Sequence, residues 1–280
     1  MRLIFIRHGD PDYKNDNLTE KGKREAELLA KRVSKWNDIT EFYTSPLGRA
    51  KATAKPSLEL LDRKAISCDW LQEFYYRTKY PENFFIKELA GKETMCWDFL
   101  PEIFYSDKLH FDSDHWTESA IMKEGKIREH YKEVCDGIDG ILAKYGYLRN
   151  SAGFYDVKTP QDNPNFEARY SGLDKGGIGG SGKEKYQLVS EKNLHENCTL
   201  VFFCHLGIMF TIIAHLIGLS PMQLWQGFYV APTSITILNT EERIRGQAAF
   251  RVERLGDTNH LTNGGEPISS SGYFTDLLHE

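Results

Sequence analysis

The 280-residue sequence lacks several features that would place it in a membrane or outside the cell. No apolar stretch approaches the roughly 20 residues that a bilayer-spanning helix needs. Only four apolar residues, Leu3 to Ile6, precede Arg7, which is too few for the core of a signal peptide. The five cysteines are an odd number and show no Cys-x-x-Cys spacing, which is typical of reduced thiols in the cytosol. These absences predict a cytoplasmic protein with no membrane partner.

An excess of positive charge is also missing. The formal net charge is −5, which argues against a protein that binds nucleic acid over a broad surface. A local basic pocket for an anionic ligand remains compatible with this value. The length predicts one large domain or one domain with an insert, and we find no internal repeat.

The most informative residues follow three strand-like runs. In an open α/β sheet the ligand crevice lies at the carboxyl ends of the strands, so side chains just after such runs are candidates for one site. Each run here is followed by a cation or an imidazole: Leu3–Ile6 by Arg7 and His8, residues 41–44 by Arg49, and residues 200–204 by His205.

Helical patterns alternate with these runs. Residues 18–33 have helical spacing of apolar residues, with Thr19 as the expected N-cap. Ser45 followed by Pro46 predicts a second helix start, with Ser45 as the N-cap, and this helix should run to about Asp62. A short strand is expected at residues 65–68. The alternation predicts an α/β three-layer sandwich with a mostly parallel central sheet and helices on both faces.

The middle of the chain breaks this rhythm. We expect residues 1–73 and 198–262 to form the α/β core, residues 74–197 an inserted cap over the active site, and residues 263–280 a loose polar tail. Within the insert, the patterns predict a helix at 123–145, a hairpin at 147–157 and a mobile glycine-rich loop at 171–183. Late strands are expected at 234–238 and 248–254.

Five short motifs, in this order, are together specific although none is so alone. The sequence resembles the histidine phosphatase superfamily, also called phosphoglycerate-mutase-like, in its phosphatase branch. The resemblance covers roughly residues 1–75 and 198–262. The matching motifs are Leu3-Ile4-Phe5-Ile6-Arg7-His8-Gly9, Leu18-Thr19-Glu20-Lys21-Gly22, Ser45-Pro46-Leu47-Gly48-Arg49-Ala50, Leu71-Gln72-Glu73 and Phe203-Cys204-His205.

The resemblance implies roles for these residues. His8 would be the nucleophile that forms a phosphohistidine, which water then hydrolyses. Covalent catalysis thereby replaces one displacement at phosphorus by two successive ones. Arg7 and Arg49 would clamp the phosphate, since a guanidinium offers a planar fork for two oxygens. His205 and the amide of Leu206 would hold a further phosphoryl oxygen. The site would use no metal and no cofactor, and the substrate would be a small phosphorylated metabolite.

Glu73 is the expected general acid, because the leaving alcohol needs a proton as its bond to phosphorus breaks. The residues after Glu73 differ from the pattern of phosphoglycerate mutases, and this difference favours a phosphatase. Arg77, together with aromatic residues of the insert, would contact the substrate beyond the phosphate. The aromatic cluster of residues 74–85 could equally pack the insert against the sheet.

Two other functions stay open. A mutase or phosphotransferase would pass the phosphoryl group from His8 to a second alcohol, and a binding module would hold the phosphate without chemistry. The acidic residues Asp10, Asp12 and Asp16 lack the spacing of an EF-hand calcium loop, so we expect a solvated turn there rather than a metal site.

Overall fold

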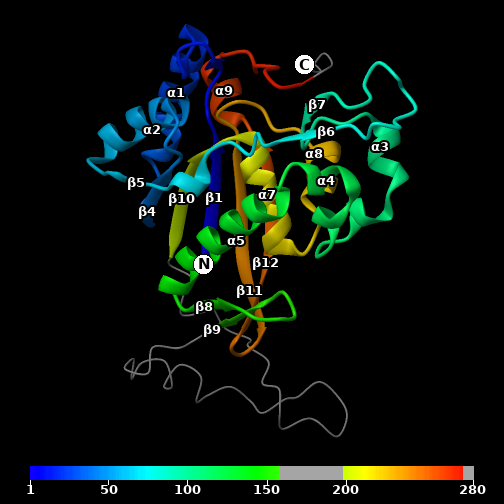
Figure 1. Ribbon diagram of the computed structural model, residues 1–280. Helices are drawn as coiled ribbons and strands as arrows, with labels where there is room; N and C mark the ends of the chain where they lie inside the picture. Colours follow the sequence, from blue (N-terminus) through cyan, green and yellow to red (C-terminus); the bar gives the residue numbers. More distant parts are fainter. Residues whose placement is uncertain (158–197, 274–280) are drawn as a thin grey trace, which may run out of the picture.

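An eight-stranded mixed sheet forms the centre of the molecule in a computed structural model that describes residues 1–157 and 198–273 (Figure 1). Four neighbouring strands are parallel and the other four are antiparallel, so the predicted mostly parallel sheet is wrong in this respect. From one edge to the other the order is β5 (Ala65–Ser67), β4 (Ile39–Thr44), β10 (Thr199–Cys204), β1 (Arg2–Arg7), β11 (Ile235–Ile244), β12 (Gln247–Asp257), β9 (Tyr155–Val157) and β8 (Tyr147–Arg149).

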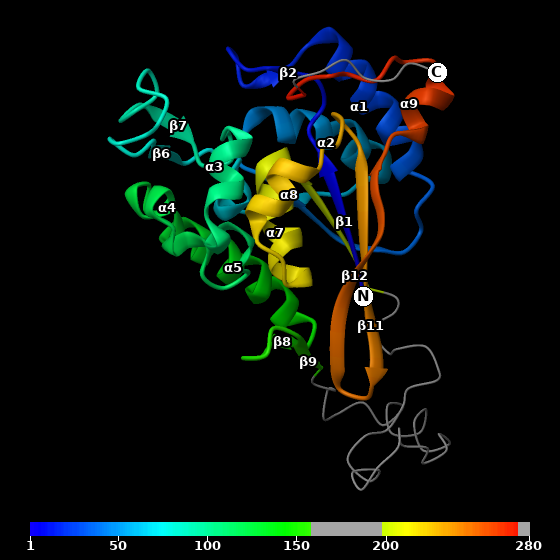
Figure 2. The same cartoon turned by 90° about the vertical axis from the view of Figure 1, so that its right-hand side faces the viewer.

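Both faces of the central strands are buried, as the three-layer prediction requires. Leu3 and Phe5 of β1 belong to one hydrophobic cluster, and Ile4 and Ile6 belong to another. Successive side chains of a strand point to opposite faces, so the sheet carries a core on each side. In Figure 2, α5 (Ile127–Lys144) and α7 (Leu206–Ile217) lie on one side of β1, and α1 (Glu20–Val33) lies on the other with α9 (Asn259–Gly264). The α/β three-layer architecture is confirmed.

The first helix begins as predicted and the second does not. The Thr19 hydroxyl accepts a hydrogen bond from the Gly22 amide and caps α1. The next helix, α2 (Gly48–Leu61), starts with Leu47 at the N-cap and has no side-chain cap. The Ser45 hydroxyl lies 2.7 Å from Nε2 of His205 instead. The prediction of Ser45 as an N-cap is therefore wrong, because its hydroxyl is used between two strand ends.

Part of the predicted insert, residues 74–197, joins the central sheet. Its helix and its hairpin are present as α5 and as β8 with β9, and β9 pairs with β12 to extend the central sheet. The glycine-rich segment 171–183 lies outside the described residues. The remaining elements of this region are β6 (Arg77–Lys79), β7 (Glu93–Met95), α3 (Pro101–Ser106), α4 (Ala120–Glu124) and the single 3-10 turns Asp69–Leu71, Lys108–Phe111 and Trp116–Glu118.

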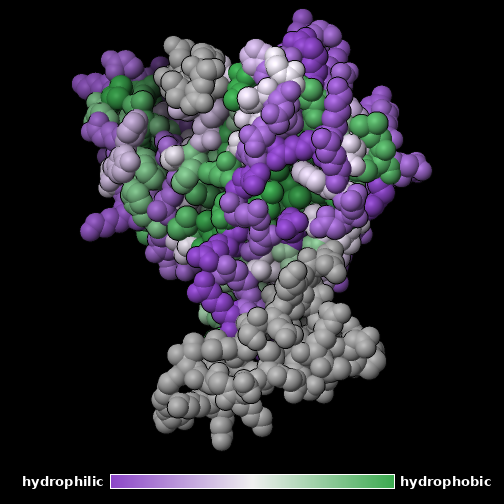
Figure 3. Space-filling model, turned by 180° about the vertical axis from the view of Figure 1, so that it is seen from behind, coloured by the Kyte–Doolittle hydropathy of each residue, from purple (hydrophilic) through white to green (hydrophobic). Residues whose placement is uncertain are grey.

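Short elements complete the chain. A two-stranded ladder, β2 (Pro11–Asp12) with β3 (Asn17–Leu18), follows the first strand, and α8 (Pro221–Gly227) precedes β11. Among residues 1–157 and 198–273, no helix combines the length and the apolar character needed to cross a bilayer. Seen from behind, the molecule shows hydrophobic residues in the middle of this face with hydrophilic residues around them (Figure 3).

The last described residues, 266–273, pack against the body and do not form the loose tail that was expected. Glu266 accepts hydrogen bonds from Arg24 and Lys21 of α1. The ring of Tyr273 stacks on Tyr229 with 4.4 Å between the centroids. We call residues 266–273 the carboxy-terminal segment. It lies at the same end of the sheet as the carboxyl ends of the parallel strands (Figure 1).

Candidate active site

The two predicted histidines meet at the carboxyl edge of the sheet. Strands β1 and β10 are parallel neighbours and pair Arg7 with Cys204, so the residues that follow them, His8 and His205, emerge side by side. Their ring centroids are 5.0 Å apart, and both side chains are buried. The register of the ladder alone therefore accounts for this pair.

His8 is held in one tautomer. Its Nδ1 lies 2.7 Å from the carbonyl oxygen of Gly9. A carbonyl can only accept, so Nδ1 carries the hydrogen and Nε2 keeps its lone pair. Burial and the positive charge of Arg7 lower the pKa of His8 well below its ordinary value. The imidazole is thus neutral at physiological pH, which is the form that attacks phosphorus.

The two predicted arginines lie near both histidines, and each is already anchored. The guanidinium of Arg7 donates to the carbonyl oxygens of Val230 at 2.7 Å and Ser271 at 2.8 Å. Arg49 donates to Asp16 at 2.8 Å, and the Asp16 carboxylate also accepts from the Gly48 amide. These bonds fix the direction of both cations before any ligand arrives.

Several buried donors of the site have no partner within the described part of the chain. They are Nε of Arg7 and Nε of Arg49. Nδ1 of His205 also has no partner there, and it donates in the tautomer whose Nε2 accepts from the Ser45 hydroxyl. Unpaired buried polar atoms are costly, and an anion bound among them would satisfy them. Burial and the neighbouring His8 lower the pKa of His205, so its ring is neutral until a bound anion offsets these effects.

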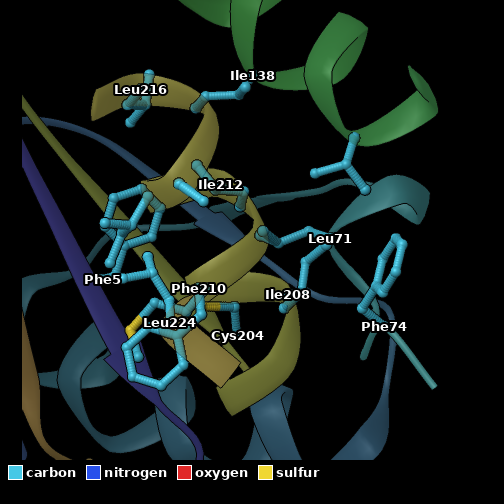
Figure 4. Close-up of a cluster of buried hydrophobic side chains, with 14 of the residues drawn as sticks. Phe5, Leu71, Phe74, Ile138, Cys204, Ile208, Phe210, Ile212, Leu216 and Leu224 are labelled. Atoms are coloured by element: carbon cyan, nitrogen blue, oxygen red, sulfur yellow. The ribbon is translucent and has the colours of Figure 1, made fainter. Parts of the chain in front are cut away.

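Glu73 lies beside this group as a partly buried carboxyl that lines the cavity described below. Its Oε1 accepts from the Phe74 amide at 2.8 Å and from the Ile208 amide at 3.0 Å. Burial raises the pKa of Glu73, which favours the protonated form that a general acid needs. Figure 4 shows Leu71 and Phe74, which flank Glu73 along the chain, in the hydrophobic cluster that includes Ile208 of α7.

A glycine is required at position 207. A Cβ atom there would lie 2.7 Å from Oε1 of Glu73, which is closer than real contacts allow. The absence of a side chain is therefore needed where α7 passes the acid.

A cavity of about 600 Å³ is lined by Arg7, Arg49 and Glu73, whereas His8 and His205 are buried and are not among its lining residues. Leu206 is one of the lining residues. Arg77 does not line it: its side chain is mostly exposed and lies 3.6 Å from Glu93. The lining residues are Arg7, Tyr13, Asp16, Leu47, Arg49, Glu73, Tyr75, Met95, Trp97, Leu206, Gly207, Phe210, Trp225 and Gly272.

Two contributions to the site escaped the sequence analysis. Asp16 was expected in a solvated turn, yet it binds Arg49 and the start of α2. Asp16 lies 32 positions before Gly48 in the sequence, so no local pattern connects the two. The Ser271 and Val230 carbonyls that hold Arg7 are backbone atoms, so no side chain marks them. In the described residues, no cluster of three or more His, Cys, Asp or Glu side chains could hold a metal ion.

Comparison with known families decides what this arrangement is. The family model described as "Histidine phosphatase superfamily (branch 1)" matches residues 3–80. This part of the chain is similar to that superfamily. The match includes Arg7, His8, Arg49 and Glu73, and the family expected from the sequence is confirmed.

One protein similar to this chain is itself named as a phosphatase. Phosphoserine phosphatase 1 of Hydrogenobacter thermophilus is 24% identical over 147 residues, which are 44% of this chain and 69% of that protein. The family and this relative support phosphatase activity.

Solved structures share the fold over nearly the whole chain. Bacillus stearothermophilus YhfR matches with a TM-score of 0.51 at 18% identity, over 93% of this chain and 98% of that one. A mutant phosphoserine phosphatase of Entamoeba histolytica, in complex with phosphoserine, has a TM-score of 0.50 at 16% identity, with the same two coverages. At this level of identity the likeness concerns the fold.

Proposed function

We propose that the protein hydrolyses a phosphate monoester of a small metabolite through a phosphohistidine on His8. The observation that carries the proposal is the Nδ1–Gly9 hydrogen bond, which leaves a lone pair on Nε2 of a neutral His8 that feels the positive charges of Arg7 and Arg49. A binding module would not need this tautomer. A nucleophile does, because only the unprotonated ring nitrogen can attack phosphorus.

The first step forms the bond between Nε2 of His8 and phosphorus and breaks the bond between phosphorus and the ester oxygen. That oxygen leaves with the bonding electrons and takes the proton of Glu73, so a neutral alcohol departs. Arg7 and Arg49 are fixed beforehand, so they stabilise the charge on the phosphoryl oxygens without rearranging.

The second step reverses these roles. The Glu73 carboxylate takes a proton from water as the water oxygen attacks phosphorus, and the electrons of the N–P bond return to Nε2 of His8. Phosphate leaves, and His8 and Glu73 are restored. Arg7 and Arg49 supply the positive charge for both steps, and the proposal includes no metal and no cofactor.

The decisive experiment traps the intermediate. The enzyme is mixed with p-nitrophenyl phosphate, quenched in alkali within milliseconds, and the phosphorylated residue is mapped by mass spectrometry. We expect acid-labile phosphate on His8 and a stoichiometric release of free phosphate. His8→Ala should lose both, while His115→Ala, which alters an exposed histidine outside the cavity, should retain both.

Other outcomes identify the alternatives. A phosphohistidine whose phosphate returns to a second alcohol, with no free phosphate, indicates a mutase or phosphotransferase. A protein that binds phosphate monoesters but forms no phosphohistidine and no product is a binding module. Turnover by His8→Ala within about tenfold of the wild type would remove His8 from the mechanism, since loss of the nucleophile should cost far more.

A further inference from the structure

The cavity beyond the phosphate site has an aromatic and apolar wall. Its volume of about 600 Å³ is far more than a phosphate group needs and falls within the range of sites for larger ligands. The side chains that form this wall come from four separate parts of the chain: Tyr13, Leu47, Tyr75, Met95, Trp97, Leu206, Phe210 and Trp225.

The two tryptophans present only the carbon atoms of their rings to the cavity, because the N–H group of each indole already donates a hydrogen bond to the backbone. Nε1 of Trp97 donates to the carbonyl oxygen of Phe74 at 2.9 Å, and Nε1 of Trp225 donates to that of Gly207 at 3.1 Å. Each indole is thereby tied to the backbone beside Glu73 or beside His205. A tryptophan without a free N–H offers a ligand mainly apolar ring surface.

Trp97 also lies close to the proposed acid. A Cβ atom built on Gly207 would be 3.6 Å from Cδ1 of Trp97 and 2.7 Å from Oε1 of Glu73. The indole and the carboxyl thus border the same small space. A leaving alcohol protonated by Glu73 would place its first carbons against this ring.

Charged partners for the rest of a substrate are missing from the lining. The only cations among the lining residues of the described chain are the proposed phosphate clamps Arg7 and Arg49. The other ionisable groups there are acids: Asp16, which is paired with Arg49, and Glu73, whose raised pKa favours the protonated form. A carboxylate on the leaving group would enter this space without a cation of its own, and burying an unpaired charge is costly.

We propose, building on the phosphatase function above, that the leaving group of the substrate is a flat, uncharged aromatic alcohol and not a charged one such as serine. The wall stabilises such a ring by burying it. An ammonium-carboxylate group binds less well, because no further cation of the lining can pair with its carboxylate. Tyr75 is the specificity residue most open to test. It lines the cavity, and it is 45% exposed, so its replacement leaves the core intact.

The substrate test compares benzyl phosphate with O-phosphoserine. Both are esters of primary alcohols, so the bond to be broken is similar and the difference reports recognition. We expect kcat/KM for benzyl phosphate to exceed that for O-phosphoserine by at least about tenfold, the effect of burying much of one ring. Comparable values, or a preference for O-phosphoserine, would overturn the proposal.

The variant test uses Tyr75→Ala and Tyr75→Lys. The alanine should raise KM for benzyl phosphate several-fold and leave O-phosphoserine unchanged. The lysine adds a cation to the wall and should raise kcat/KM for O-phosphoserine. Tyr105→Ala removes a tyrosine that is 72% exposed and outside the lining. It should leave kcat/KM unchanged for both benzyl phosphate and O-phosphoserine. Equal effects of Tyr75→Ala on both substrates would contradict a role in selecting the leaving group.

Failure of this inference can be separated from failure of the function. Release of phosphate from p-nitrophenyl phosphate together with a preference for O-phosphoserine would refute the aromatic leaving group and leave the phosphatase intact. No phosphate release from any of the three esters would refute both.

Discussion

Glu73 is the residue whose role depends most on its surroundings. It is a partly buried carboxyl with a raised pKa, and only its Oε1 accepts from the two amides. Glu73→Gln keeps those acceptor contacts and removes the transferable proton. We expect kcat for an alkyl phosphate to fall by about 10²–10⁴, the usual value of general acid catalysis.

The matched measurement uses an ester that needs no acid. The p-nitrophenolate leaving group is stable without protonation, so p-nitrophenyl phosphate should lose less than about tenfold on the same Glu73→Gln substitution. Equal losses on both esters would point to a structural role for Glu73 or to rate-limiting hydrolysis of the phosphohistidine.

His8 should stay neutral into the acid range. Its pKa is lowered first by burial and then by the charge of Arg7, and both disfavour the protonated ring. The nucleophile is therefore active at pH values where an exposed histidine, with a pKa near 6.5, is already protonated. Phosphate esters themselves titrate near pH 6, so the ring is best followed by NMR in the free protein. If the NMR titration of the His8 ring has its midpoint at or above about pH 6.5, this expectation is contradicted.

Glu25 carries a different consequence, for stability. It is a buried carboxyl of α1 that accepts from the Asp10 amide, and burial raises its pKa to about 7. The folded protein then holds a proton that the unfolded chain loses near pH 4.3, so the free energy of unfolding falls from about pH 4 to pH 7. Above pH 7 this loss is complete and constant.

Glu25→Gln removes that titration and keeps an acceptor for the amide. It should raise the free energy of unfolding at pH 8 by up to about 3 kcal/mol relative to wild type, and by much less at pH 5. Urea unfolding at the two pH values measures both differences. A gain that is the same at both would show that the carboxyl is not the cause.

At the scale of elements, the amino-terminal half of the site could be predicted from sequence because local signals mark each part of it. The apolar run of β1, the cap at Thr19 and the alternation up to β5 need no knowledge of distant residues. The direction of β11 and β12 could not be predicted, since a strand-like pattern does not reveal its neighbour. The same holds for Arg77, whose charge suggested a ligand contact although its partner Glu93 lies across the β6–β7 hairpin.

The carboxy-terminal segment was the least predictable element and should be a functional one. Two hydrogen bonds join the segment to the residues around His8. The Ser269 hydroxyl donates to the Asp10 carboxylate, and the Ser271 carbonyl oxygen accepts from the Arg7 guanidinium. A chain that ends after Gly265 loses both contacts and leaves one side of Arg7 without its acceptor. We expect kcat/KM to fall at least about tenfold, because an Arg7 side chain without this acceptor no longer holds the phosphate in a fixed orientation.

A matched control separates this effect from simple shortening. A chain that ends after Tyr273 keeps every contact described for the segment and should retain wild-type kcat/KM. Asp10→Asn, which weakens the bond to Ser269, should fall between the two chains. If the chain ending after Gly265 is folded and fully active, the segment does not position Arg7.

For the whole molecule, stability depends on the stack at the centre of the sheet. The ring of Phe202 lies between Phe5 and Tyr43, with 5.0 Å between centroids on each side. These three residues come from adjacent strands, so one substitution loosens the layer that carries every catalytic residue. Phe202→Ala should lower the free energy of unfolding by about 3–5 kcal/mol. Denaturant titration measures this loss, and Tyr105→Ala, at the surface, should stay within about 0.5 kcal/mol of wild type.

The bond between Arg7 and the Ser271 carbonyl joins residues that are 264 positions apart. During synthesis, Arg7 leaves the ribosome long before Ser271 is added to the chain. The phosphate clamp therefore stays incomplete on a nascent chain, however much of the sheet has already formed. Full activity should therefore need Ser271 to be synthesised and outside the ribosome, and a ribosome-bound chain stalled before Ser271 should hydrolyse p-nitrophenyl phosphate poorly.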